Sequence, residues 1–203
     1  MTSIFRIRLG AGVMRRSETS GLSNGVRRTW RAAALAGLTI AIVGCGSTST
    51  STSTMTVNAT DVSGIPAGDA TGTSLSGTYL ITSASIEACL CRVGSCAMIT
   101  AQTGGTLSFS QQGGGLSIID QSGTVLTGGV NADLSYTCGG TATVPAGEGQ
   151  GQVYGLQKGT FAVSGSTPTE TQFQIYETLT ATFLGASYDC DYVGAGIAHY
   201  EGP

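Results

Sequence analysis

The chain has 203 residues, of which only 10% are charged, and its formal net charge is −3. Seven of its nine basic residues lie before residue 32, so from Cys45 onward two basic side chains stand against eleven acidic ones, a net side-chain charge of −9. Binding to a phosphate backbone requires a basic surface. The composition therefore excludes nucleic acid as a partner, and it excludes adhesion to anionic lipid through charge.

Residues 1–44 have the features of an export signal. Several arginines precede an apolar run of 13 residues, Ala32 to Gly44. As a helix this run would reach about 20 Å, which is short of the ~30 Å hydrocarbon core of a bilayer. A short apolar run behind a basic region is typical of a secretory signal peptide. Met14 is an alternative start of the same signal.

The apolar run ends in Ile42-Val43-Gly44-Cys45, which resembles the lipobox of bacterial lipoproteins. The resemblance implies cleavage between Gly44 and Cys45, a diacylglyceryl group on the Cys45 sulfur and acylation of the new N-terminus. Several acyl chains matter, because one chain alone anchors a protein only marginally. The resemblance also implies a bacterial cell envelope location with the membrane as partner. Gly46 favours the outer over the inner membrane, since an Asp after the cysteine retains lipoproteins of this family at the inner membrane.

Residues 45–76 are rich in Ser, Thr and Gly and offer few side chains to bury. Such a composition does not offset its ordering entropy. We therefore expect a disordered tether over 45–76, between the acylated N-terminus and a folded domain at 77–203.

Residues 77–203 alternate between apolar and polar side chains in short segments separated by glycine-rich turns. This pattern predicts an all-β, antiparallel domain of eight or nine strands. We expect an up-and-down barrel, with a β-sandwich as the alternative. The expected strands lie at 77–84, 106–111, 116–120, 124–129, 132–138, 152–157, 160–165, 171–183 and 188–200.

Gly77-Thr78-Tyr79, followed by one hairpin after another, resembles the start of the lipocalin and avidin-like barrels. Those families usually have Gly-x-Trp at this place, and this sequence has no tryptophan after Trp30. The resemblance implies a barrel architecture, and the missing tryptophan argues against a biotin-type pocket.

Five cysteines follow Cys45 in the sequence: Cys89, Cys91, Cys96, Cys138 and Cys190. An exported protein meets an oxidising compartment, so disulfides are the expected state, with one thiol left over. The first and last strands of a closed meander pair with each other, and this places Cys190 beside the 89/91/96 cluster. We expect Cys190 to bond one of these three and Cys138 to bond another. A metal site in the cluster is less favoured, because zinc takes four ligands and the single histidine is distant in sequence.

The sequence offers no convincing catalytic set and implies no cofactor. His199, the single histidine, lies four residues from the C-terminus, where we expect an exposed tail. Asp189 and Asp191 should share one face of a strand, which indicates a solvent-facing acidic pair, since calcium needs more oxygen ligands.

Glu177 interrupts the apolar stripe of the segment 171–183. The segment is long for one strand, so we favour a turn or bulge that exposes Glu177. The alternative directs Glu177 into the barrel, where its charge would need Lys158 or Arg92 as a partner. In that case Glu177 is the candidate contact for a bound ligand.

Three functions remain open at this stage. The first is an envelope lipoprotein whose domain is a structural or protein-interaction module. The second is a binder of a small apolar ligand inside the barrel, and an enzyme is the least favoured. A binder needs a cavity of ~300–1,000 Å³ with a few polar groups, whereas a module has an interior filled by side chains.

Overall fold

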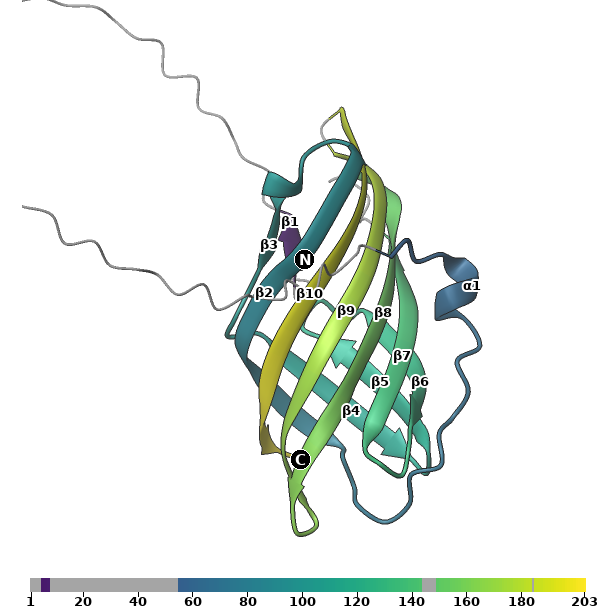
Figure 1. Ribbon diagram of the computed structural model, residues 1–203, viewed down its shortest axis with the longest axis vertical. Helices are drawn as coiled ribbons and strands as arrows, with labels where there is room; N and C mark the ends of the chain where they lie inside the picture. The colour runs from purple at the N-terminus through teal and green to yellow at the C-terminus, as the bar shows by residue number, and fades with distance from the viewer. Residues whose placement is uncertain (1–4, 8–54, 144–148, 184) are drawn as a thin grey trace, which may run out of the picture. The chain divides into compact units, whose positions relative to one another are not determined.

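The computed structural model describes residues 5–7, 55–143, 149–183 and 185–203 (Figure 1). Within these ranges the structure is all-β, as predicted, and its helical residues are confined to two short elements. The elements in chain order are β1 (Phe5–Ile7), α1 (Ala59–Val62), β2 (Gly77–Val93), η1 (Cys96–Met98), β3 (Ile99–Ala101), β4 (Thr106–Gln112), β5 (Gly115–Asp120), β6 (Val125–Val130), β7 (Ser135–Thr143), β8 (Gly149–Ser164), β9 (Thr167–Phe183) and β10 (Ala186–Gly202).

Within the described ranges, eight strands close into an antiparallel barrel in the order β10-β2-β4-β5-β6-β7-β8-β9. The predicted up-and-down barrel is confirmed, and β2 begins at Gly77, the predicted start of the domain. The last strand closes the ring by pairing with the first, with Cys190 directly opposite Cys91. The two remaining strands, β1 and β3, pair with each other in a separate small sheet. Because β1 belongs to the predicted signal peptide, the barrel itself contains no residue of that segment.

Four neighbouring strands are much longer than the rest. β2, β9 and β10 have 17 residues and β8 has 16, whereas β4, β5 and β6 have six or seven. β2 pairs with β4 only over Gly77–Leu80, but it follows β10 as far as Val93. Figure 1 accordingly shows the long strands continuing past the short ones.

Two sequence-based predictions about these strands are wrong. The segments 152–157 and 160–165 are parts of one strand, β8, and β9 runs through Glu177 without a turn or bulge. The physical reason is that β9 is hydrogen-bonded along both edges to strands of similar length. Gly159, which lies between these two segments, is part of β8, and a Cβ there would stand 2.4 Å from the Gln172 carbonyl oxygen and 2.8 Å from the Tyr136 ring.

Aromatic side chains fill the barrel interior at the level of the short strands. Tyr79 is fully buried, and its ring centroid lies 4.9 Å from that of Phe109. Phe161 lies 5.1 Å from Phe109 and 4.9 Å from Tyr136, and aromatic pairs at these separations attract each other beyond the effect of burial. The Tyr79 hydroxyl donates a hydrogen bond of 2.9 Å to the carbonyl of Leu75. The tyrosine of the Gly-Thr-Tyr sequence is therefore a core residue.

Residues 55–76 pack against the barrel, so the prediction of a disordered tether is wrong for this part of 45–76. Val57 and Val62 join Leu156 of β8 in a small cluster, and α1 lies alongside β7 and β8 (Figure 1). Ala70 and Leu75 belong to the barrel core. The chain is tied down between these points by hydrogen bonds from the Gly68 amide to Gly114 and from the Ala70 amide to Val130.

Candidate functional site

Glu177 points into the protein, and only 6% of the residue is exposed. It lies on β9 with Gly155 of β8 on one side and Tyr192 of β10 on the other. The Tyr192 hydroxyl donates a hydrogen bond to the Glu177 carboxylate. Glu177 also lies close to the backbone of β8: a Cβ on Gly155 would stand 3.5 Å from Glu177 Oε1, an ordinary van der Waals contact. The inward alternative is therefore the correct one for Glu177.

Burial raises the pKa of Glu177 to about 8, and the negative charge of Asp120 acts in the same direction. The hydrogen bond from Tyr192 favours the ionised form, but it does not outweigh these two effects. The expected cationic partners lie elsewhere, since Arg92 is bonded to two aspartates and Lys158 stands over the Tyr176 ring. Near neutral pH the carboxyl group therefore carries a proton in much of the population, and a neutral acid can donate a hydrogen bond as well as accept one.

Tyr192 was missed by the sequence analysis. The signal was present in the run Tyr188-Asp189-Cys190-Asp191-Tyr192, where Tyr and Cys alternate with Asp. In a strand this alternation places the three non-acidic residues on one face. Cys190 and Tyr192 are both buried in the structure.

Asp191 is buried, with 2% of the residue exposed, so the prediction of a solvent-facing acidic pair is wrong for it. Arg92 bridges the two acids: Nη2 lies 2.6 Å from Asp189, and Nη1 lies 2.7 Å from Asp191. The hydroxyl groups of Thr56 and Thr178 donate to Asp191 over 2.7 and 2.8 Å. Thr56 precedes the barrel, so this network also fixes the segment 55–76 to β9 and β10.

The pKa values of Asp189 and Asp191 are both lowered, but the main causes differ. The hydrogen bond from Arg92 is the main cause at Asp189. At Asp191 burial acts to raise the pKa, but hydrogen bonds from Arg92, Thr56 and Thr178 together hold it below its usual range. Both groups are therefore carboxylates at neutral pH, and their arrangement around Arg92 is that of a structural ion-pair network.

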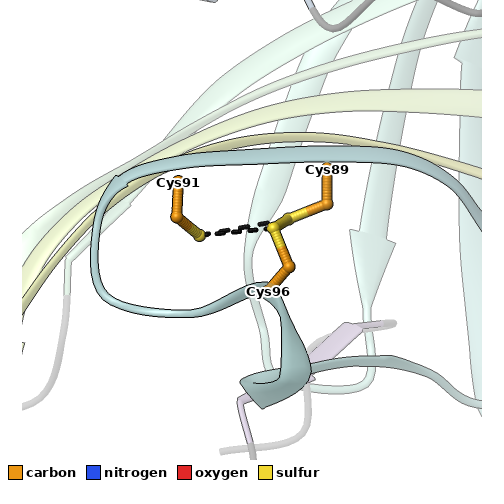
Figure 2. A group of neighbouring side chains, drawn as sticks. All are labelled: Cys89, Cys91 and Cys96. Carbon is orange, nitrogen blue, oxygen red and sulfur yellow. Dashed lines mark hydrogen bonds between the residues drawn. A yellow bond between two sulfur atoms is a disulfide. The ribbon is translucent and has the colours of Figure 1, made fainter.

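Four cysteines form two disulfides, Cys89–Cys96 and Cys91–Cys190. The expected bond between Cys190 and the 89/91/96 cluster is confirmed. The expected bond to Cys138 is wrong, because Cys138 is a buried free thiol whose sulfur lies 3.8 Å from the Leu116 carbonyl oxygen, in the barrel core. The cluster forms its own second bond instead, since the chain after β2 folds back and brings Cys96 beneath Cys89 (Figure 2).

A cavity of about 380 Å³ opens across the four long strands. Lys158 lines this cavity together with polar side chains that include Ser83, Gln172 and Gln174. Exposed Gln172 and Gln174 alternate with buried Phe173 and Ile175, so the cavity belongs to the outer face of the barrel. It does not adjoin Glu177, and the ligand role of Glu177 stays a prediction.

Three further predictions concern the rest of the chain. His199 is not a frayed tail: β10 continues to Gly202, and the half-exposed imidazole lies 4.0 Å from Glu170. Gly44 and Cys45 lie outside the described residues, so cleavage and lipidation stay predictions. Neither helix among the described residues is long and apolar enough to cross a membrane.

No protein-family model, curated protein or solved structure matches the chain.

Proposed function

We propose that the chain is a lipid-anchored lipoprotein of the bacterial envelope whose barrel is a structural or protein-interaction module. The observation that supports a structural or protein-interaction module is the filled interior of the barrel. There the aromatic rings pack against one another: Tyr79, Phe109, Tyr136 and Phe161. A barrel that holds a small ligand keeps that space open. The first part rests on the lipobox ending at Cys45 and the short apolar run before it.

Because residues 55–76 pack against the barrel, the stretch between the proposed anchor and the barrel is shorter than the predicted tether of residues 45–76. Ten peptide units separate Cys45 from Met55, the first residue of the docked segment. Even when fully extended, this stretch spans no more than about 35 Å. The barrel is then held close to the bilayer, near the scale of one membrane thickness. Close tethering suits a module that works on the membrane surface or on proteins embedded in it.

Metabolic labelling with a fatty-acid probe tests the anchor. The wild type and a Cys138→Ser control should both take up the label, and Cys45→Ser should not. Persistent label on the Cys45→Ser protein would contradict the proposal. Fluorescence gives an independent reading, because Trp30 is the only tryptophan and lies in the predicted signal peptide. The processed protein should therefore emit from tyrosine alone.

A second candidate function is binding of a small apolar ligand that carries a hydrogen-bonding group. The observation in its favour is Glu177, an ionisable group buried in an otherwise apolar interior. Native mass spectrometry of protein purified from its own host separates the two functions. A filled module should show the mass of the acylated chain alone, whereas a binder should show an added mass that Glu177→Gln diminishes.

A further inference from the structure

The four bonded cysteines form a single sulfur cluster. Cys89 and Cys91 project from the same face of β2, and Cys96 reaches them from η1 (Figure 2). Cys190 lies opposite Cys91 in the register of β2 and β10. Between the two disulfides, Cys91 Sγ lies 3.5 Å from Cys96 Sγ and 4.0 Å from Cys89 Sγ. A sulfur atom of each disulfide is therefore in van der Waals contact with the other disulfide.

The two disulfides differ in their exposure to solvent. Cys89 and Cys96 are both half-buried, so an external thiol can reach the bond between them. In the second disulfide Cys91 is half-buried as well, whereas Cys190 is 1% exposed, so an external thiol can reach this bond only from the side of Cys91. Exchange proceeds by attack of a thiolate on a disulfide sulfur, and its rate depends on access. The shielded disulfide is thus open to attack from inside the cluster, by a sulfur already in contact with it.

We propose that this cluster is a thiol–disulfide exchange site that accepts an electron pair from a dithiol, either a small molecule or a protein. One thiolate of the dithiol attacks Cys89 Sγ, forms a mixed disulfide and releases Cys96 as a thiolate. The second thiol of the dithiol then attacks its own sulfur in the mixed disulfide. This step releases Cys89 as a thiol and leaves the dithiol as a cyclic disulfide, so that two electrons and one proton have passed to the protein and Cys96 is a thiolate.

The Cys96 thiolate then undergoes exchange with the second disulfide. It attacks Cys91 Sγ, so that a Cys91–Cys96 bond forms, the Cys91–Cys190 bond breaks and Cys190 leaves as a thiolate that takes a proton. One protein disulfide remains at the end. Cys138 takes no part, because burial raises the pKa of its thiol to about 12 and its sulfur lies against Leu116.

The exchange changes what the remaining disulfide connects. Cys91–Cys190 joins β2 to β10, the first and last strands of the barrel, across a sequence separation of 99. Cys91–Cys96 spans five residues within one segment. The strand pair that closes the barrel is then held without a covalent link, by its hydrogen bonds and by the pairing of Arg92 with Asp189 and Asp191. The proposal does not depend on lipidation or on the proposed function of the barrel.

Peptide mapping of the native wild-type protein tests the exchange without any variant. The purified full-length processed chain is treated with one equivalent of dithiothreitol, quenched with acid, alkylated and digested without further reduction. We expect a Cys91–Cys96 disulfide together with alkylated Cys89 and Cys190. Recovery of Cys91–Cys190 alone, with Cys89 and Cys96 both alkylated, would overturn the proposal.

A matched variant measures the relay itself. Cys89→Ser/Cys96→Ser removes the accessible disulfide and leaves the shielded one in place. We expect dithiothreitol to open Cys91–Cys190 at least about tenfold more slowly in this variant than in the wild type, with circular dichroism confirming that both are folded. Equal rates would show that the shielded disulfide is attacked directly and would contradict the relay.

Discussion

Tyr192 donates its hydroxyl hydrogen bond to Glu177 from the neighbouring strand, and the two residues stand directly opposite each other in the register of β9 and β10. A carboxyl group in the protein interior is thus bonded to a neutral donor. Its charge has no cationic partner among the described residues, because Arg92 and Lys158 are engaged elsewhere. Because burial raises the pKa of Glu177 to about 8, we expect the stability of the protein to depend on pH near neutrality.

The first prediction concerns Glu177→Gln. Burial raises the pKa of Glu177 from 4.5 to about 8 in the folded protein. Between these values the folded state holds a proton that the unfolded state has released, so the stabilisation is complete below about pH 4.5 and is lost as pH rises to 8. The free energy of unfolding of the wild type should fall over this window by an amount on the order of a few kcal/mol. Glu177→Gln should lack this slope.

Thermal melts at pH 5 and pH 8 measure the effect, and Glu201→Gln, at an exposed position, serves as the control. The amide group that replaces the carboxyl group in Glu177→Gln keeps an oxygen for the Tyr192 hydroxyl, so this variant should gain stability relative to the wild type at pH 8. Parallel melting of all three proteins at both pH values would contradict a buried carboxyl group.

The second prediction concerns Tyr192→Phe, which removes the donor and keeps the ring. At pH 8 the change should cost about 1–3 kcal/mol, because a buried and partly ionised carboxyl group loses its hydrogen bond. At pH 5 the cost should be smaller, since the carboxyl group is then neutral. Tyr154→Phe is the matched control, because its hydroxyl bonds to Gln152 at the surface and its loss should change stability by less than about 0.5 kcal/mol. Denaturant titration at the two pH values gives both numbers.

The sequence-based prediction was most reliable for strands that have one buried face and one solvent-exposed face. In β4, Leu107 and Phe109 alternate with exposed Ser108 and Ser110, and this alternation locates the strand within one residue. The prediction failed where a glycine lies inside a strand, as in β8. Gly159 separates two predicted segments, but it lies inside β8, where the Gln172 carbonyl oxygen and the Tyr136 ring leave no place for a side chain. Composition alone does not distinguish a glycine in a turn from a glycine within a strand that leaves space for a neighbouring side chain.

The candidate site was predictable only in part, for a related reason. The meander topology places Cys190 beside the 89/91/96 cluster, and the sequence order of the strands was sufficient for that expectation. It did not indicate which of the three cysteines is the partner, and the structure shows that it is Cys91. The second bond depends on the chain folding back after β2 to bring Cys96 to Cys89, and no periodicity records this path. The packing of residues 55–76 against the barrel was likewise not predictable from the sequence. Its buried residues are too widely and irregularly spaced to form a pattern, and their burial is decided by the barrel surface that they meet.

The third prediction tests this docking with Leu75→Ala. Leu75 has no exposed surface, and its backbone amide donates to Gln111 Oε1 over 2.9 Å. Truncation should cost about 2–5 kcal/mol, as for a leucine in a protein core. Met55→Ala, at a residue 39% exposed at the start of the same segment, should change stability by less than about 0.5 kcal/mol. If chemical unfolding found Leu75→Ala as stable as the wild type, the segment would be a tether after all.

The last prediction compares the two disulfides by the loops that they close. In the loop-entropy model a bond restricts the unfolded chain more when the sequence separation is greater. The separations are 99 for Cys91–Cys190 and 7 for Cys89–Cys96. The model assigns roughly 4–5 kcal/mol to the first bond and about 2–3 kcal/mol to the second. Cys91→Ala/Cys190→Ala should therefore unfold at a lower denaturant concentration than Cys89→Ala/Cys96→Ala, by a difference worth about 2 kcal/mol. Equal unfolding midpoints in guanidinium chloride, with equal slopes, would show that the two bonds contribute equally and would contradict a stabilisation that grows with the sequence separation.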